Sequence, residues 1–478
     1  MTPPAVPALL DPLVREFVDT ALVAVAARHG TPLHLVFPQV FARNAAALRG
    51  VLSARGVEHR LCYAHKVNRS HAFVRETQHL GLDIDIASAG ELDSALGAGF
   101  PPARIEATGP KGERLLRRLL ADGVTINVDN RWELDRIIAL AEHPVPILLR
   151  VSGFPGTAVS RFGIPADEVD ALWPLLAANH DRVALRGLSF HLDTGEHRDR
   201  LRAVTTCLAL LESAWSAGLS PDVLDIGGGL RQVFTADPAA YDTYTRALRT
   251  ALLGDGPPLT WAGATFGYRV GDGSVHGIPV FHKYANTVPA TAALAALLDA
   301  EIPGQHRPLA AILTDNLLRL WLEPGKALAD HAGITVASVE FTKDLPDGTV
   351  LVNLDLSRDQ VTPADQEALV DPLLVPAQPP PEHPEPLGVF LAGRLCLERD
   401  MISNRAIRLP FRPRPGDLLV FPNTAGYHSD LSAGTAAMHP LPRRLAVTRD
   451  RSTFTAGPDA GHRPAEEGPC APTTTSPN

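Results

Sequence analysis

The chain has 478 residues, of which 45% are hydrophobic and 20% are charged, and its formal net charge is −9. This length exceeds one ordinary domain and suits a barrel-sized domain with a smaller second one, with enough apolar residues for a large core. The acidic balance argues against nucleic acid or an anionic membrane as a partner, because both require a basic surface.

The N-terminal segment carries no sign of a targeting sequence. Its apolar residues are interrupted by Asp11, Arg15, Glu16 and Asp19, so no continuous signal-peptide core forms. No apolar run reaches the length of a transmembrane helix. We therefore expect a cytoplasmic protein.

Cysteine usage agrees with this expectation. The chain has four cysteines, far apart and without Cys-x-x-Cys spacing, which favours a reducing compartment over a disulfide framework or a zinc ribbon. We expect Cys62 in the core of a strand, Cys207 in the core of a helix and Cys470 in the C-terminal tail. No metal site is predicted.

Residues 35–333 alternate short apolar runs with longer amphipathic ones. The short runs predict buried parallel strands and the longer ones predict helices. Repeated β–α units over this length predict an α/β fold of the TIM type, a (β/α)8 barrel; an open doubly wound sheet is the alternative that periodicity leaves open. The short runs are LHLVF, RLCYA, LDIDIA, IEAT, TINV, PVPILLRVS, LRGLSFHL and VLDIGGG.

The pattern changes after residue 333. Residues 334–450 contain strand-like runs separated by turn residues and without helices between them, which predicts a C-terminal β-rich domain that includes part of residues 1–34. Residues 451–478 are expected to be a disordered tail. Residues 254–290 resemble a hairpin inserted late in the barrel, for which the sequence suggests no role.

Lys66 is the first candidate for chemistry, because it follows the apolar run RLCYA. Catalytic groups of a barrel lie at the carboxyl ends of its strands. A lysine buried there would have its pKa lowered by desolvation and could form a Schiff base. The alternative is a solvated lysine that simply precedes a helix.

Three further strand ends carry candidate groups. Residues 227–229 are three glycines, whose backbone amides can converge on an anion or merely form a tight turn. His191 follows the run LRGLSF and is either catalytic or structural. Glu323 precedes a Pro-Gly turn, and its carboxylate could simply pair with Lys326.

Together these motifs resemble one family. YAHKVN, DIASAGEL, ILLRVS, SRFGI, SFHLDTG, DIGGGL, EPGKAL, GRLCLERD and GDLLVFPNTAGY are similar, in this order, to motifs of the fold-type III pyridoxal-phosphate decarboxylases. This family includes diaminopimelate, ornithine and biosynthetic arginine decarboxylases and is related to alanine racemase. The resemblance covers residues 35–447.

The resemblance implies pyridoxal 5'-phosphate as the cofactor and places six residues around its ring. Lys66 would form the Schiff base, and Glu323 would pair with the ring nitrogen. His191 would stack on the pyridine face. Arg150 and Asp85 would lie close to the ring, together with Glu91 of the same motif as Asp85.

The resemblance also implies a phosphate site made of the glycine turn, a hydroxyl group, a Pro-Gly-Lys turn and a tyrosine. The matching residues are Gly227, Gly228, Gly229, Thr194, Gly325, Lys326 and Tyr427.

Cys396 in GRLCLERD matches the catalytic cysteine that enters the active site from the partner subunit in this family. The resemblance therefore implies a homodimer with shared sites. The alternative for Cys396 is a buried core cysteine.

Decarboxylation of an amino acid leaves an electron pair at Cα, which the ring of the cofactor accepts. A carboxylate at the ring nitrogen strengthens this acceptor, whereas racemases of the same fold place an arginine there, so Glu323 favours decarboxylation. Cys396 or Lys66 would then supply the proton to Cα. The alternatives are an amino-acid racemase on the same fold and a non-catalytic pyridoxal-phosphate-binding protein.

Three departures from the family pattern stand out. Asp193 and Thr194 replace a Gly-Ser pair, which sets a carboxylate near an anionic phosphate, while Lys326 replaces an arginine. Leu397 follows Cys396, where diaminopimelate and ornithine decarboxylases carry an acidic residue for the distal ammonium. We therefore expect that neither diaminopimelate nor ornithine is the substrate. The hypothesis is that the substrate is a different amino acid, either free or tethered to a carrier.

Overall fold

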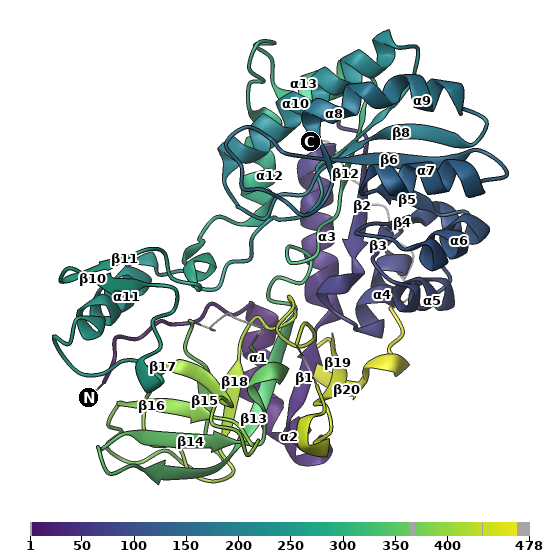
Figure 1. Ribbon diagram of the computed structural model, residues 1–478. Coiled ribbons are helices and arrows are strands. Elements are labelled where there is room, and N and C mark those ends of the chain that lie inside the picture. Colours follow the sequence, from purple (N-terminus) through teal and green to yellow (C-terminus); the bar gives the residue numbers. More distant parts are fainter. Residues whose placement is uncertain (1, 363–368, 433, 466–478) are drawn as a thin grey trace, which may run out of the picture.

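The computed structural model describes residues 2–362, 369–432 and 434–465 (Figure 1). Within these residues, eight parallel strands close into a barrel, because β5 pairs with β6 and β12 pairs with β2. The predicted (β/α)8 barrel is confirmed, and the open doubly wound sheet is excluded. In order around the barrel, the strands are β2 (His59–Ala64), β3 (Asp83–Ile86), β4 (Ile105–Ala107), β5 (Thr125–Val128), β6 (Val145–Ser152), β8 (Val183–Ser189), β9 (Val223–Asp225) and β12 (Arg319–Leu322).

Helices surround the barrel strands, and several begin at a capping side chain. Ser70, Ser88 and Asn130 accept a hydrogen bond from a backbone amide in the first turn of α4, α5 and α7. The helices are α3 (Pro38–Ser53), α4 (His71–His79), α5 (Ala89–Gly97), α6 (Glu113–Asp122), α7 (Arg131–Leu140), α8 (Ala166–Val169), α9 (Trp173–Ala178), α10 (His197–Ser216), α12 (Ala290–Asp299) and α13 (Leu309–Asp315). Helix α11 (Pro238–Leu252) lies apart from the barrel and packs with residues 254–290 and the β-rich part (Figure 1).

The first apolar run, LHLVF, is not a barrel strand, so this part of the prediction is wrong. It forms β1 (Leu33–Val36), which pairs antiparallel with β13 (Gly333–Asp344) and parallel with β19 (Arg443–Asp450). All four residues of β1 are buried, and a short apolar run does not specify which sheet it joins. The run that contains Trp321 supplies β12 instead.

The second sheet therefore unites the two ends of the chain (Figure 1). The predicted β-rich part is confirmed as a fold feature, with α1 (Pro12–Thr20) and α2 (Leu22–His29) beside it. Its strands other than β1, β13 and β19 are β14 (Val350–Leu354), β15 (Leu373–Val375), β16 (Leu387–Ala392), β17 (Met401–Leu409), β18 (Leu418–Phe421) and β20 (Thr453–Pro458).

The tail expected at residues 451–478 is ordered in its first part, which corrects that expectation. β20 pairs antiparallel with β19, and the side chain of Asp459 binds the first turn of α4. Its carboxylate accepts hydrogen bonds from the Ser70 hydroxyl at 2.5 Å and from the amides of His71 and Ala72. Cys470 lies outside the described residues.

The insertion at residues 254–290 contains the expected hairpin. Strands β10 (Arg269–Gly271) and β11 (Ser274–His276) pair antiparallel. The insertion packs on the β-rich sheet rather than on the barrel alone, since the amide of Ala406 in β17 donates to the carbonyl of Leu259. This contact brings Tyr284, near the end of the insertion, to the barrel mouth.

None of the helices in the described part of the chain combines the length and the apolar character needed to span a bilayer.

The Asp459 contact yields a stability prediction. We expect Asp459→Ala to lower the free energy of unfolding by roughly 1–3 kcal/mol, since three donors at the start of α4 lose their acceptor in a buried position. Denaturant unfolding measures the change. Asp450→Ala, at the exposed end of β19, is the control and should leave the stability within about 0.5 kcal/mol of the wild type. Equal stabilities of the two variants would contradict the capping role.

Candidate active site

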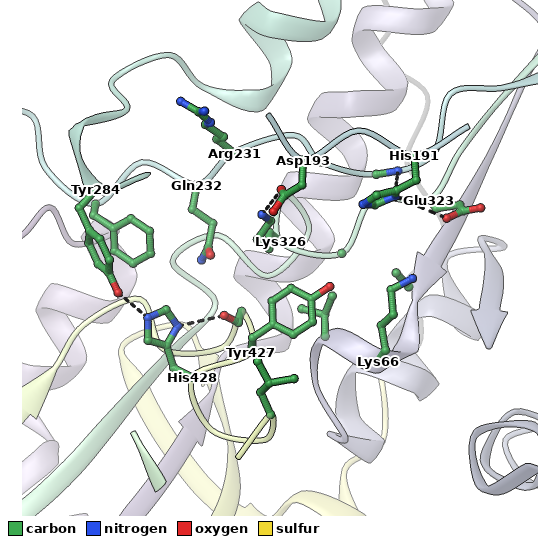
Figure 2. Close-up of a pocket in the computed structure, with 18 residues that line it drawn as sticks. Lys66, His191, Asp193, Arg231, Gln232, Tyr284, Glu323, Lys326, Tyr427 and His428 are labelled. Atoms are coloured by element: carbon green, nitrogen blue, oxygen red, sulfur yellow. Dashed lines mark hydrogen bonds and ion pairs between the residues drawn. The ribbon is translucent and has the colours of Figure 1, made fainter. Parts of the chain in front are cut away.

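A cavity of about 210 Å³ opens at the carboxyl ends of the barrel strands (Figure 2). Lys66 and Glu323 lie at one end of it, and Tyr284 and His428 lie at the other. Its walls come from barrel strand ends, from the segment after β18 and from the insertion. The cavity thus joins parts of the chain that are distant in sequence.

Lys66 lies in a 3-10 turn directly after β2, as the barrel prediction required. Its side chain is 34% exposed, and its amine is 3.4 Å from the carboxylate of Asp85 on β3. Burial alone would lower the pKa of Lys66, but the negative charges of Asp85 and Glu323 outweigh it and raise that pKa. The expectation of a lowered pKa is therefore wrong, because it considered desolvation alone and not the charges of Asp85 and Glu323 on the amine.

His191 and Glu323 form the far wall of this end of the cavity. Burial and the charges of Lys66 and Arg150 lower the pKa of His191 to about 3, so its ring is neutral near pH 7. Its Nδ1 accepts a hydrogen bond from the amide of Gly228 at 3.2 Å, which places the ring proton on Nε2. A neutral imidazole therefore lies 4.0 Å from the buried carboxyl of Glu323.

The glycine turn after β9 cannot accept side chains. A Cβ on Gly228 would lie 2.5 Å from the carbonyl oxygen of Glu323, and one on Gly229 would lie 1.9 Å from that of Leu192. Gly227 has a φ of 64°, which favours glycine as well. Gly228 and Gly229 thus bring bare backbone to the cavity wall.

Arg200 on α10 holds the glycine turn from behind. Its buried guanidinium donates to the carbonyls of Ile226, Gly228 and Leu192 at 2.7–3.0 Å. Burial lowers the pKa of Arg200 to about 10, because no carboxylate contacts it closely enough to offset desolvation. Nothing in the sequence indicated this role, since Arg200 is one of several arginines on its helix.

Asp193 and Lys326, two departures from the family pattern, bind each other. The amine of Lys326 is 2.5 Å from Oδ1 of Asp193, and both residues line the cavity beside Gly325. The carboxylate of Asp193 is therefore balanced by a positive charge at the same wall. Thr194 is half-buried, and its hydroxyl oxygen accepts from the amide of Glu196.

Tyr427 brings the β-rich part of the chain to the Lys66 turn. Its backbone adopts a φ of 72°, and its amide donates to the carbonyl of Val67 at 3.0 Å. Burial is the main cause that raises the pKa of Tyr427. The phenol therefore remains protonated and faces the cavity opposite Lys66 (Figure 2).

A Tyr284–His428 pair closes the far end of the cavity, and the sequence analysis missed it. Burial lowers the pKa of His428 to about 4, and its Nδ1 donates to the carbonyl of Gly426. The phenol of Tyr284 must then donate to Nε2, at 2.7 Å. In the sequence, the one indication of this pair was that His428 directly follows Tyr427. No motif pointed to Tyr284.

Six predicted residues lie outside the described cavity lining, namely Asp85, Glu91, Arg150, Thr194, Gly227 and Cys396. Arg150 on β6 is 3.4 Å from Asp129, although its charge still acts on Lys66 and Glu323. Glu91 accepts from the amide of Ala87 at the start of α5. Cys396 is exposed in the loop between β16 and β17.

The arrangement fits pyridoxal phosphate at three points. Lys66 offers an amine, Glu323 offers an acid group for a ring nitrogen, and the tight turn at Gly228 and Gly229 offers side-chain-free backbone for a phosphate. Lys326 lies beside that turn, with its charge balanced by Asp193.

Comparison with known proteins agrees with this fit. A family model described as "Pyridoxal-dependent decarboxylase, pyridoxal binding domain" matches residues 41–257. The chain is 37% identical over 436 residues to the uncharacterized protein y4yA of Sinorhizobium fredii, with 89% of each chain covered. It is 30% identical over 252 residues to a diaminopimelate decarboxylase of Pseudomonas aeruginosa, covering 49% of this chain and 60% of the relative.

Solved structures share the fold. A protein named AQ1208 from Aquifex aeolicus superposes with a TM-score of 0.67 at 22% identity, over 91% of this chain and 90% of its own. A lysine/ornithine decarboxylase of Vibrio vulnificus, complexed with putrescine, gives a TM-score of 0.64 at 21% identity, over 92% of this chain and 99% of its own.

The contact between Lys66 and Asp85 predicts how fast the amine reacts with pyridoxal phosphate. We expect the rate of attachment to rise with pH between 6 and 9, because the raised pKa of Lys66 leaves little neutral amine at neutral pH. Asp85→Asn should lower that pKa and speed attachment at pH 7 by about tenfold for each pKa unit. Stopped-flow absorbance of the cofactor-free protein mixed with cofactor measures the rate.

The control for this prediction is Asp83→Asn on the same strand. Asp83 is paired with Arg60 and Arg104 and does not contact Lys66. Its substitution should leave the rate at pH 7 unchanged. A rate independent of pH, or equal effects of the two substitutions, would contradict the role of Asp85.

Proposed function

This chain belongs to the fold-type III pyridoxal-dependent decarboxylase family, and on that premise we propose that it decarboxylates an amino acid with pyridoxal 5'-phosphate. The observation that carries the proposal is the single cavity shared by the Lys66 amine, the Glu323 carboxyl and the glycine turn. Figure 2 shows the amine and the carboxyl at the same end of this cavity, which supports the proposal.

Lys66 is proposed to bind the aldehyde of the cofactor covalently. The bound cofactor supplies an acceptor for the electron pair that is left at Cα when CO₂ departs. Glu323 holds a proton at the ring nitrogen, because burial and the neighbouring Asp85 and Asp225 raise the pKa of its carboxyl. Neutral His191 is suited to lie flat against the ring, while Arg150 and Asp85 set the local charge.

The phosphate is proposed to bind between the glycine turn and the segment at Lys326. Gly228, Gly229 and Gly325 line the cavity with side-chain-free backbone and Gly227 precedes them in the same turn, while Tyr427 contributes its hydroxyl group. The hydroxyl of Thr194 accepts from a backbone amide, so its own proton is available to donate.

Cys396 is proposed to act in the active site of a second copy of the chain. It is exposed on a loop that lies apart from the described lining of its own cavity. The loop is held in shape by Asp400, which accepts from the amides of Leu395 and Arg358 at 2.7–2.8 Å. A rigid, exposed cysteine can serve as the proton donor to Cα in a homodimer.

The substrate is proposed to be neither diaminopimelate nor ornithine, although several relatives carry the first name. Leu397 is 50% exposed at the position beside Cys396, so the site presents an apolar group there. The carboxylate of Asp400 is buried in the loop and occupied by two amides. A different amino acid, free or tethered to a carrier, fits this loop better than diaminopimelate or ornithine does.

One experiment tests the covalent role of Lys66 and the substrate class together. Borohydride reduction of the cofactor-loaded protein should leave a pyridoxyl group on Lys66, identified by peptide mapping, and Lys66→Ala should abolish it. Incubation with a pool of amino acids should release CO₂, and mass spectrometry should identify the amine. A colourless protein, or strong turnover of meso-diaminopimelate, would contradict the corresponding part of the proposal.

Subunit complementation tests the role of Cys396. Lys66→Ala and Cys396→Ala should each be inactive alone. After subunit exchange the mixture should recover about one quarter of wild-type activity, since about half of the dimers are mixed and each mixed dimer has one intact site of two. Absence of recovery in a mixture whose exchange is verified would contradict the shared site.

A further inference from the structure

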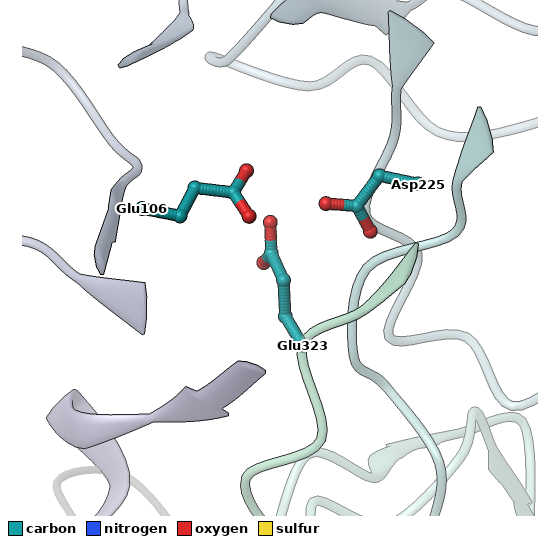
Figure 3. Close-up of side chains that lie close together, drawn as sticks. All are labelled: Glu106, Asp225 and Glu323. Atoms are coloured by element: carbon teal, nitrogen blue, oxygen red, sulfur yellow. The ribbon is translucent and has the colours of Figure 1, made fainter. Parts of the chain in front are cut away.

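Two more carboxyl groups face Glu323 inside the barrel (Figure 3). Glu106 projects from β4 and Asp225 from β9, and one oxygen of each of the three groups lies within 4.8 Å of the others. Their residues are at most 5% exposed. We call Glu106, Asp225 and Glu323 the carboxyl triad.

The triad has too few hydrogen-bond donors around it. The amide of Asn127 donates to both glutamates, to Glu106 at 3.2 Å and to Glu323 at 3.4 Å. Cys62 contributes a weak S–H contact at 3.6 Å to Glu106, and the amide of Gly227 donates to Oδ1 of Asp225. Oδ2 of Asp225 is fully buried and has no donor among the described residues.

Three negative charges cannot persist in this position. No lysine or arginine of the described chain forms an ion pair with a member of the triad, and like charges at this separation repel strongly in a buried site. A proton on one carboxyl removes a charge and supplies the donor that Oδ2 of Asp225 lacks. The triad therefore holds shared protons, as two-carboxylate sites do.

We propose that Glu106 and Asp225 are positioning residues that share protons with Glu323 and so set the charge that Glu323 presents to the ring nitrogen of the cofactor. This inference rests on the proposed function. If Glu323 gave its proton to the ring nitrogen of a bound cofactor, its O–H bond would break, and O–H groups on Glu106 and Asp225 would stabilise the carboxylate that remains. Glu323 can thereby ionise without contact with water.

Burial is the main cause that raises the pKa of each triad member, and the pKa of Asp225 reaches about 7. Other charged or titratable groups face the triad from the surrounding strands and turns and belong to the same balance. They are Cys62, Lys66, Asp85, Arg60, Arg150 and His191.

The first test follows the absorbance of the bound cofactor against pH. Glu106→Gln keeps the size and polarity of the side chain but cannot exchange a proton, so Glu323 loses a proton-sharing neighbour. We expect the midpoint of the absorbance change to move to lower pH by about one unit. Glu106→Asp should restore most of the shift, and Cys62→Ala, which removes only the S–H contact, should leave the midpoint in place.

The second test needs no cofactor. A carboxyl whose pKa is raised on folding stabilises the protein below its unfolded pKa of about 4, and this stabilisation is lost as pH rises through the folded pKa. For Asp225 the loss is complete above about pH 7. The melting temperature of the cofactor-free wild type should therefore fall between pH 5 and pH 8, and it should fall less in Glu106→Gln.

The two tests separate the possible failures. Wild-type behaviour of Glu106→Gln in both tests would overturn the inference, and Asp225→Asn provides a second variant if the first does not fold. If no cofactor binds, the proposed function fails, while the melting curves still decide whether the triad shares protons. A cation site is the remaining alternative. It would be identified, and the proposal overturned, if Mn²⁺ raised and a chelator lowered the melting temperature of the wild type while neither changed that of Glu106→Gln.

Discussion

The ion pair between the Lys66 amine and the carboxylate of Asp85 is the interaction on which the site depends. At 3.4 Å it fixes the amine at the barrel mouth, and with Glu323 it keeps the amine protonated. A protonated amine is not a nucleophile, so the charges that position Lys66 also lower its nucleophilicity. The electrostatics of the barrel interior therefore set both the position and the protonation state of this amine.

The barrel accounts for this crowding of charge. Parallel strands that close on themselves bring the carboxyl ends of β2, β3, β4, β9 and β12 to one small region, whatever their separation in sequence. The carboxyl groups that face this region are shielded from water, and burial favours their neutral forms. The charge of Lys66 and the protonation of the carboxyl triad therefore depend on each other.

The sequence was sufficient for the barrel, the β-rich part and the groups at strand ends, because β–α periodicity and strand-end motifs are local signals. It misassigned LHLVF, since a four-residue buried strand looks the same in either sheet. It also missed Tyr284 and Arg200, whose roles arise from contacts across the fold. The raised pKa of Lys66 was missed for the same reason: Asp85 and Glu323 approach it only once the barrel has closed.

The pair of Asp193 and Lys326 shows why single departures from a family pattern mislead. Taken alone, Asp193 opposes a phosphate, and Lys326 is a weaker phosphate ligand than arginine. In the structure their charges cancel at 2.5 Å on the cavity wall. The two changes therefore act together, and this pair adds no net charge to the cavity wall. In the proposed function, a phosphate at this wall would depend on backbone amides and on Tyr427 rather than on the charge of this pair. The close packing at Gly228 and Gly229 has a separate cause, because a Cβ there would meet the carbonyl oxygens of Glu323 and Leu192.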